Sequence, residues 1–475
     1  MYCTDRTKTQ NSGSKSREQR GCSFFHTFFL FVISLFTKNI CSCIMKSMRR
    51  VIFHVDVNSA FLSWEAVYRL RVLGETLDLR EIPAAVGGDM EKRHGIILAK
   101  SPLAKKYGVR TGEPVVDAKR KCPGLVLVPP RHDLYKRESA ALMEILREYS
   151  PEVEQFSVDE AFLDMTGMEA LFGEPVAAAY GLKERIYREL GFTVNIGISE
   201  NKLLAKMASD FEKPDKVHTL FQAEVPEKMW PMPVGELFLV GKATERRLSQ
   251  LGIRTIGELA MTDVKVLKSY LKKHGELIWE FANGHDVSLV EPEPPENKGY
   301  GNSTTIAFDV TDAQTAKLVL LSLAETVASR LRRAGKKAEV ISVSIKNNEL
   351  HRESHQMQLE SPSDITEELY EAACKLFDEL WDQSPIRLLG IHAGKLAEGE
   401  GRQLNIFDKG KYEKLEKLDA ALDSIRLRHG KDAVMRASFL ESPFDHMTWK
   451  MNGKEERRRA GTAGEIKKGN KEERL

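Results

Sequence analysis

The chain has 475 residues, of which 42% are hydrophobic and 29% charged, and its formal net charge is +2. This composition is typical of folded globular proteins and excludes a wholly disordered or membrane-embedded chain. Because the length exceeds what one hydrophobic core usually fills, we expect about two to four domains. A chain this close to neutral can offer a nucleic-acid surface only where basic residues cluster locally.

The cysteines are badly distributed for a disulfide scaffold. Four of the six lie near the start of the chain: Cys3, Cys22, Cys41 and Cys43. Only Cys122 and Cys374 belong to the rest of the chain, and no pair there has the spacing of metal ligands. This usage favours a reducing cytoplasm.

Residues 1–47 differ from everything that follows, because a polar, Lys- and Ser-rich start leads into an apolar run over 22–36. The run is shorter than the roughly 20 residues of a membrane span, and no small-residue cleavage site is obvious. Three interpretations stay open: an upstream start-codon error, a membrane anchor and a secretion signal. We prefer the first, because Met45 and Met48 directly precede the first domain pattern.

Residues 51–57 form an apolar, β-branched run that predicts a strand buried on both faces. Asp56 lies near its end, and a buried acid is costly unless it is paired or coordinates a metal. The alternative is an Asp that caps a helix beginning near Asn58.

Residues 91–130 are rich in Lys, Gly and Pro and are expected to form a small mobile subdomain. An amphipathic helix is predicted over 138–149, with Ala141, Ile145 and Leu146 on one face.

Two strand-like segments within 153–166 flank the adjacent acids Asp159 and Glu160. Neighbouring residues of a regular strand point to opposite faces. The two acids can therefore serve one site only if the chain bends between them, as it does at the tip of a hairpin.

A further strand is predicted over 192–198, followed by a helix that carries Lys206 and has Ser199 as its candidate N-cap. Residues 227–285 read as a helical module containing a helix-hairpin-helix unit around 237–253. The remaining predicted segments are a polar linker (291–299), helices over 313–334 and 364–382, and a strand over 338–345. The whole is an α+β, multidomain pattern.

Asp56, Asp159 and Glu160 suit phosphoryl transfer from a nucleoside triphosphate. That chemistry needs two metal ions roughly 3.5–4 Å apart. Magnesium prefers hard oxygen ligands, with water and substrate phosphate completing the shell. A strand-end Asp followed about a hundred residues later by Asp-Glu on a hairpin therefore predicts a Mg²⁺ site.

Three motifs carry a resemblance to a known family. Residues 53–61, 157–164 and 197–206 together are similar to the signature set of Y-family DNA polymerases, and most similar to the bacterial DinB type. The resemblance covers about residues 50–408 in the family's order. It implies a right-hand polymerase in which residues 1–47 are a leader, 48–61 and 126–217 the palm, 62–125 the fingers, 218–290 the helix-hairpin-helix thumb, 291–299 a linker, 300–398 the α+β little finger, and 399–475 a clamp-binding peptide with a charged tail.

Position by position, the resemblance implies that Asp56, Asp159 and Glu160 hold two Mg²⁺ ions, with the Val57 carbonyl as a further ligand. Phe61 falls at the steric-gate position, where a flat ring would collide with a ribose 2′-hydroxyl. Ordinary core packing is the alternative for this ring.

Lys206 matches the family lysine that meets the triphosphate; without the resemblance it would be read as a solvated helix lysine. The fingers depart from the family pattern. Lys105 stands where many members have an arginine, and a lysine lacks the bidentate fork of arginine. Many members also have a tyrosine in this segment, whereas Pro102 has no hydroxyl.

Two basic segments are expected to grip DNA. The first is the hairpin of Val240, Gly241 and Lys242, whose backbone amides and helix N-terminus suit phosphate. The second lies along the little finger and consists of Arg330, Arg332, Arg333 and Lys336. The alternatives are an ordinary αα-hairpin and a solvated helix end.

The peptide after the last domain resembles the segment that docks bacterial polymerases on the sliding clamp, and its residues are Gln403, Leu404, Ile406 and Phe407. Tethering of this kind offsets a weak grip on DNA. A short helix is predicted within 412–440, and 450–475 are expected to be disordered.

The resemblance implies a translesion DNA polymerase that binds primed template and dNTP as a monomer, without a membrane. The sequence shows no second acidic cluster for proofreading, which suggests low fidelity. A palm-type nucleotide cyclase and a non-catalytic, clamp-tethered DNA-binding subunit are the alternatives.

Overall fold

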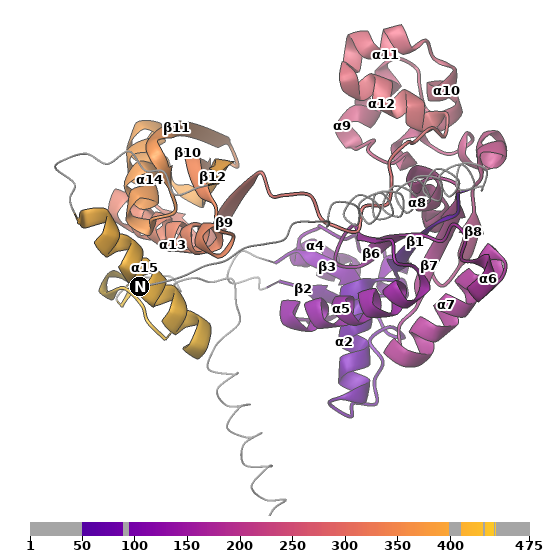
Figure 1. The fold of residues 1–475 in the computed structure, drawn as a ribbon, viewed down its shortest axis with the longest axis horizontal. Helices are drawn as coiled ribbons and strands as arrows, with labels where there is room; N and C mark the ends of the chain where they lie inside the picture. The colour runs from indigo at the N-terminus through magenta and orange to yellow at the C-terminus, as the bar shows by residue number, and fades with distance from the viewer. Residues whose placement is uncertain (1–49, 89–94, 399–409, 431–432, 441, 443–475) are drawn as a thin grey trace, which may run out of the picture. The chain divides into compact units, whose positions relative to one another are not determined.

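The computed structural model describes residues 50–88, 95–398, 410–430, 433–440 and 442. Contacts divide the chain, whose helices and strands are labelled in Figure 1, into two units: Met1–Ile82 with Arg131–Pro294, and Pro83–Pro130 with Pro295–Leu475. In both units the chain forms mixed helices and sheets, as the α+β prediction requires.

The first unit is built on a five-stranded sheet in the order β5-β6-β1-β7-β8. Its strands are β1 (Ile52–Val57), β5 (Val153–Gln155), β6 (Glu160–Asp164), β7 (Val194–Ser199) and β8 (Val217–Thr219). All six residues of the central strand β1 are buried, which confirms the prediction of a strand covered on both faces. In the antiparallel ladders, Asp56 lies opposite Glu160 on one side and Asn195 on the other.

The tight connection between β5 and β6 confirms the hairpin expected at Asp159 and Glu160. The two strands pair antiparallel, Asp159 lies in the connection, and Glu160 is the first residue of β6. The chain therefore bends between the two acids.

Helices pack around this sheet: α2 (Ala60–Arg71), α5 (His132–Tyr149), α6 (Glu169–Phe172), α7 (Pro175–Leu190) and α8 (Lys202–Asp210). Helix α8 packs against β7 and β1. Helix α5 begins six residues before its predicted start, and it buries Ile145 and Leu146 while Ala141 is only half-buried.

The prediction that Ser199 caps α8 is wrong. Ser199 is the last residue of β7, and its hydroxyl donates to the Leu220 carbonyl at 2.5 Å. Asn201 is the N-cap, because its side-chain oxygen accepts from the Leu204 amide at 2.8 Å. Strand β7 continues one residue beyond its last apolar residue, Ile198, and therefore includes Ser199.

The helical module of the first unit contains η1 (Gln222–Glu224), η2 (Val225–Met229), η3 (Val234–Glu236), α9 (Lys242–Gln250), α10 (Ile256–Met261), α11 (Val264–Leu271) and α12 (Lys273–Ala282). The predicted first helix of the hairpin, at the start of 237–253, is wrong: residues 237–240 form a turn just after η3, and α9 is the predicted second helix. The apolar core of the module includes Leu203, Leu204 and Met207, so α8 is packed against the sheet and the module together.

One part of the second unit is a three-stranded sheet in the order β3-β2-β4. Its elements are β2 (Ala84–Gly87), β3 (Ile97–Lys100), α3 (Pro102–Lys106), α4 (Val115–Lys121) and β4 (Val126–Val128). The sequence indicated a subdomain here but none of these short strands.

The other part is a four-stranded sheet in the order β11-β10-β12-β9. Its elements are β9 (Gly299–Val310), α13 (Ala313–Arg333), β10 (Lys337–Asn347), β11 (Arg352–Ser363), α14 (Thr366–Leu380) and β12 (Ile386–Ala397), followed by α15 (Lys411–His429) and η5 (Ala437–Phe439). Apolar side chains of α13 and α14 pack on the sheet. The two helices and the strand predicted here are confirmed to within a few residues.

Among the residues that the structure describes, none of the helices combines the length and apolar character of a membrane span. The apolar run over 22–36 lies outside these residues.

Gly197 lets α8 approach β7 closely. A Cβ at this position would lie 2.0 Å from the Ala205 carbonyl oxygen and 2.5 Å from the Ser209 amide nitrogen. Both atoms belong to the backbone of α8, so a side chain would force the whole helix away from the sheet.

We expect Gly197→Ala to lower the free energy of unfolding by about 3 kcal/mol, because of this overpacking. Gly181→Ala on the exposed face of α7 is the matched control, since its Cβ would meet nothing within 4 Å. It should stabilise by about 0.5–1 kcal/mol. Urea unfolding measures both, and equal effects of the two substitutions would contradict the close approach.

Candidate active site

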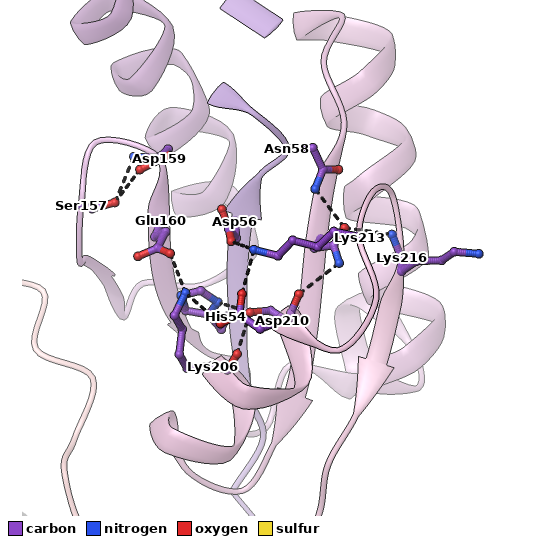
Figure 2. A network of polar contacts seen from close by, with 12 residues as sticks. His54, Asp56, Asn58, Ser157, Asp159, Glu160, Lys206, Asp210, Lys213 and Lys216 are labelled. Atoms are coloured by element: carbon purple, nitrogen blue, oxygen red, sulfur yellow. Dashed lines mark hydrogen bonds and ion pairs between the residues drawn. The ribbon is translucent and has the colours of Figure 1, made fainter. Parts of the chain in front are cut away.

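Three acids converge where β1 ends beside the β5–β6 hairpin (Figure 2). Asp56 and Glu160 are directly opposed in the ladder, which places their side chains on the same face. The Val57 amide donates to the Asp159 carbonyl at 3.1 Å, so the hairpin connection is bound to the end of β1. The backbone thus brings together the residues that the sequence predicted.

Two lysines pair with two of the three acids. The Lys206 ammonium donates to Glu160 Oε1 at 2.5 Å, and Lys213 forms an ion pair with Asp56. Asp210 joins the two, because it lies 2.8 Å from Lys213 and 3.5 Å from Lys206. Figure 2 shows these side chains as one chain of alternating charges across the sheet end.

Burial raises the pKa of Asp56 and of Asp159 above their usual range. For Asp56, which is 7% exposed, the Lys213 charge acts in the opposite direction and favours the ionised form. For Asp159 the hydrogen bond from the Ser157 hydroxyl, at 2.7 Å, has the same effect. The negative charge of Asp56 also raises the pKa of Asp159, so the two carboxylates interact electrostatically.

These carboxylates fit a divalent cation. They are hard oxygen donors, and burial makes their negative charges costly unless a cation stays close. In the described part of the chain, no group of three His, Cys, Asp or Glu side chains is gathered closely enough to hold a metal. Magnesium commonly uses one or two carboxylates with water and substrate phosphate, a pattern that this donor set can meet.

His54 lies on β1, two residues before Asp56, and is fully buried. Its Nδ1 is 2.8 Å from the Ser209 hydroxyl, and the ring packs 4.6 Å from that of Phe162. Burial, together with the charges of Lys206 and Lys213, holds the pKa of His54 well below its usual value. The ring is therefore neutral and adds no charge to the site.

Two asparagines hold the end of β1 against the chain that carries Lys213. Asn58 donates to the Asn195 side-chain oxygen at 3.0 Å and accepts from the Asp215 amide at 2.9 Å. Asn195 also donates to the Ser209 and Glu212 carbonyls at 3.0 and 2.6 Å.

Phe61, the predicted gate, is half-buried in the first turn of α2. Its ring stacks on Tyr135, with centroids 4.5 Å apart and an angle of 9° between the planes. Beneath it the Tyr135 hydroxyl donates to Glu65 at 3.0 Å, and Arg131 forms an ion pair with the same carboxylate. The ring has packing partners and partial exposure at once, so both interpretations of Phe61 stay open on the geometry.

Lys213 and Asp210 are the site residues that the sequence analysis missed. A signal was present, since Lys213 follows Lys206 by seven residues, or two helical turns. Helix α8 ends at Asp210, however, so Lys213 lies beyond the helix. Hydrogen bonds around Asn195 hold the chain after α8 in the position from which Lys213 reaches Asp56.

The remaining predicted residues belong to other segments of the chain. Lys105 is on α3 in the second unit, and Gln403, Leu404, Ile406 and Phe407 lie outside the described residues. Lys242 is the first residue of α9, and Gly241 is its N-cap. Gly241 is extended rather than left-handed, and a Cβ there would meet nothing within 4 Å. The fold itself does not require a glycine at this position.

The four predicted cations at the end of α13 differ in their surroundings. Arg330 donates to the Gly301 carbonyl at 2.8 Å, Arg332 pairs with Asp419 and Asp423, and Lys336 pairs with Glu398. Arg333 is exposed. A shallow hollow lies on the four-stranded sheet β11-β10-β12-β9, on the face that α13 and α14 do not cover. Its polar lining includes Lys298, Ser342, Gln356, Gln358, His392 and Lys395.

The chain matches known proteins along most of its length. Residues 55–210 match the impB/mucB/samB family, 223–253 the helix-hairpin-helix motif of that family, and 297–406 its C-terminal domain.

Curated relatives include the DNA polymerase IV of Clostridium acetobutylicum, 47% identical over 398 residues, which span 83% of this chain and 99% of the relative. That of Acetivibrio thermocellus is 39% identical over 83% of this chain and 98% of its own length. Among solved structures, a Y-family DNA polymerase chimera superposes with a TM-score of 0.64 at 22% identity, covering 74% of this chain and all of the chimera. This likeness confirms the expected fold class.

We expect Asp56→Asn and Asp159→Asn to weaken Mn²⁺ binding about tenfold or more, because each removes a charged oxygen donor. Paramagnetic broadening or calorimetry on the full chain measures the affinity. Asp117→Asn is the control, since that carboxylate is 44% exposed and pairs with Arg120 across one turn of α4. Metal binding that is equally weak in all three variants, or unchanged in all three, contradicts this assignment.

Proposed function

The chain belongs to the Y family of DNA polymerases, in its DinB-type branch, and on this basis we propose that it extends a primer 3′ end on a DNA template. The reaction is attack of the primer 3′-oxygen on the α-phosphate of a paired dNTP, with pyrophosphate leaving. Synthesis is error-prone, tolerates damaged templates and lacks proofreading. The observation that carries the proposal is the convergence of Asp56, Asp159 and Glu160 at one sheet end.

In the proposed reaction, Asp56, Asp159 and Glu160, with the Val57 carbonyl, hold two Mg²⁺ ions. When bound, these ions supply Lewis-acid activation of the attacking oxygen and neutralise charge on the phosphates. The chain contributes the fixed positions of the carboxylates: the β1–β6 register sets Asp56 against Glu160, and the hairpin bond to Val57 sets Asp159.

Lys206 and Lys213 bind triphosphate oxygens in this proposal. Both ammonium groups are held against the acids, and ion pairs with Asp56 and Asp210 raise the pKa of Lys213 despite its burial. A cation bound to the carboxylates would weaken these pairs and leave the lysines to face the phosphates. Lys105 matches a position at which many family members contact the triphosphate, and we assign it to nucleotide binding on that resemblance.

DNA contacts are assigned to two surfaces. At Gly241 the missing side chain leaves the amides of the α9 N-terminus open to a phosphate, and Val240 and Lys242 flank this position. On the second surface Arg330, Arg332, Arg333 and Lys336 surround the end of α13.

We also assign Gln403, Leu404, Ile406 and Phe407 to docking on a sliding clamp, and a monomeric enzyme to the cytoplasm. The two rival functions have less support. A nucleotide cyclase has no use for the family's helix-hairpin-helix motif, which residues 223–253 match. A non-catalytic subunit has no need for three acids held at one sheet end.

Primer extension tests the proposal directly. We expect Asp159→Ala in the full chain to abolish dNTP incorporation on a primed template with Mg²⁺ while leaving DNA affinity within about twofold, because the metal acids do not grip the duplex. Asp117→Ala should extend normally. Extension that survives in Asp159→Ala would assign the activity to a contaminant, and tight DNA binding without extension by the unaltered chain would favour the non-catalytic subunit.

The Phe61 gate makes a separate prediction. Phe61→Leu should raise the rate of ribonucleotide incorporation by about tenfold or more relative to deoxynucleotides, because a smaller side chain leaves room for the 2′-hydroxyl. Phe211→Leu, another half-buried ring of the first unit, should leave the discrimination unchanged. If both variants lose activity equally toward the two sugars, Phe61 is a packing residue.

A further inference from the structure

The chain beyond β12 forms a C-terminal arm, which we define as residues 410–430 and 433–440. The arm packs on α13 and α14 through charge rather than through apolar side chains. Asp419 is the only buried residue described on α15, whereas Leu418 and Leu427 are 49% and 81% exposed. Phe439 of η5 contributes a single buried ring.

An acidic stripe on α15 covers the C-terminal end of α13. Arg332 Nε lies 2.7 Å from Asp423, and its Nη1 lies 3.0 Å from Asp419. Asp419 also accepts from the Thr366 amide at the start of α14, at 2.8 Å. Glu416, one turn earlier on the same face, approaches Lys337 at 3.8 Å.

A second contact, in which the arm supplies the positive charges, holds the arm nearer to its C-terminal end. Glu325 of α13 is 2% exposed and lies between Arg426 and Arg436 of the arm, at 3.0 and 2.8 Å. Arg436 reaches Glu367 of α14 as well, at 3.3 Å. The arm therefore carries acids where α13 ends in cations and arginines where α13 carries a buried acid.

We infer that the acidic stripe of the arm and the DNA backbone compete for Arg332. This inference rests on the proposed DNA contact of the α13 end. The guanidinium donors that face Asp419 and Asp423 are the groups that would meet a phosphate, and carboxylate and phosphate satisfy the same fork geometry. Two ligands that exclude each other weaken one another by the same factor, so a docked arm lowers DNA affinity.

The test uses the full chain with Asp419→Ala and Asp423→Ala together, and measures binding to primed DNA by fluorescence anisotropy over a range of NaCl concentrations. We expect about fivefold tighter binding and a salt slope steeper by about 0.9, the value for one additional phosphate contact. The control is Glu413→Ala with Glu416→Ala. It removes the same charge from α15 but keeps both carboxylates that contact Arg332, and it should gain far less affinity.

Arg332→Gln separates competition from a purely structural arm. In the unaltered arm this substitution should weaken DNA binding by a smaller factor than in the Asp419/Asp423 variant, where it should remove the whole gain. An equal loss of affinity from Arg332→Gln in the two backgrounds overturns the inference; if the double variant fails to fold, Asp423→Ala alone serves as the second background. Equal affinity of the double variant and its control overturns it too. Failure of the proposed function looks different, because no protein of the set would then extend a primer, whatever its affinity for DNA.

Discussion

A carboxylate buried at the centre of a sheet has to be neutralised, and much of the first unit serves that requirement. Asp56 belongs to β1, the central strand of the sheet, whose six residues are all buried. Its countercharge comes from Lys213, beyond the end of α8. Helix α8 reaches the sheet because Gly197 has no side chain, and Asn195 fixes the start of the following loop by binding the Ser209 carbonyl in α8 and the Glu212 carbonyl in the loop. The geometry of the candidate site is thus a product of backbone approach as much as of the acids.

The two lysines give the site a stable arrangement with or without a cation. In the structure Asp56 and Glu160 are each paired with a lysine, which avoids the cost of leaving these two buried charges uncompensated. In the proposed reaction the positive charges brought by Mg²⁺ take over this balance, and the lysines turn to the incoming phosphates. The same residues then serve folding in one state and substrate binding in the other.

Residues with local signals were predicted well, and those fixed by distant partners were not. The apolar run of β1, the bend at Asp159 and the 3.6-residue periodicity of α13 are written in consecutive residues. The role of Lys213 depends on a carboxylate 157 positions away, and Ser199 was misassigned because its hydroxyl finds Leu220 instead of the helix. The short strands β2 to β4 lack a periodicity long enough to recognise. For the arm, the sequence shows a helix, but the side chains that Asp419 and Asp423 meet lie on α13 and α14.

The segment 83–130 enters and leaves its small sheet at neighbouring points. Strand β2 at its start pairs in parallel with β4 at its end, with Ala84 opposite Val126, and the Val126 amide donates to the Pro83 carbonyl at 2.9 Å. An insertion whose two ends are fastened together can lengthen, shorten or change composition between them without altering the span that its host must bridge. The departure of Lys105 from the common family residue lies inside such a segment. This part of the enzyme can therefore change as a separate cassette without moving the acids of the candidate site.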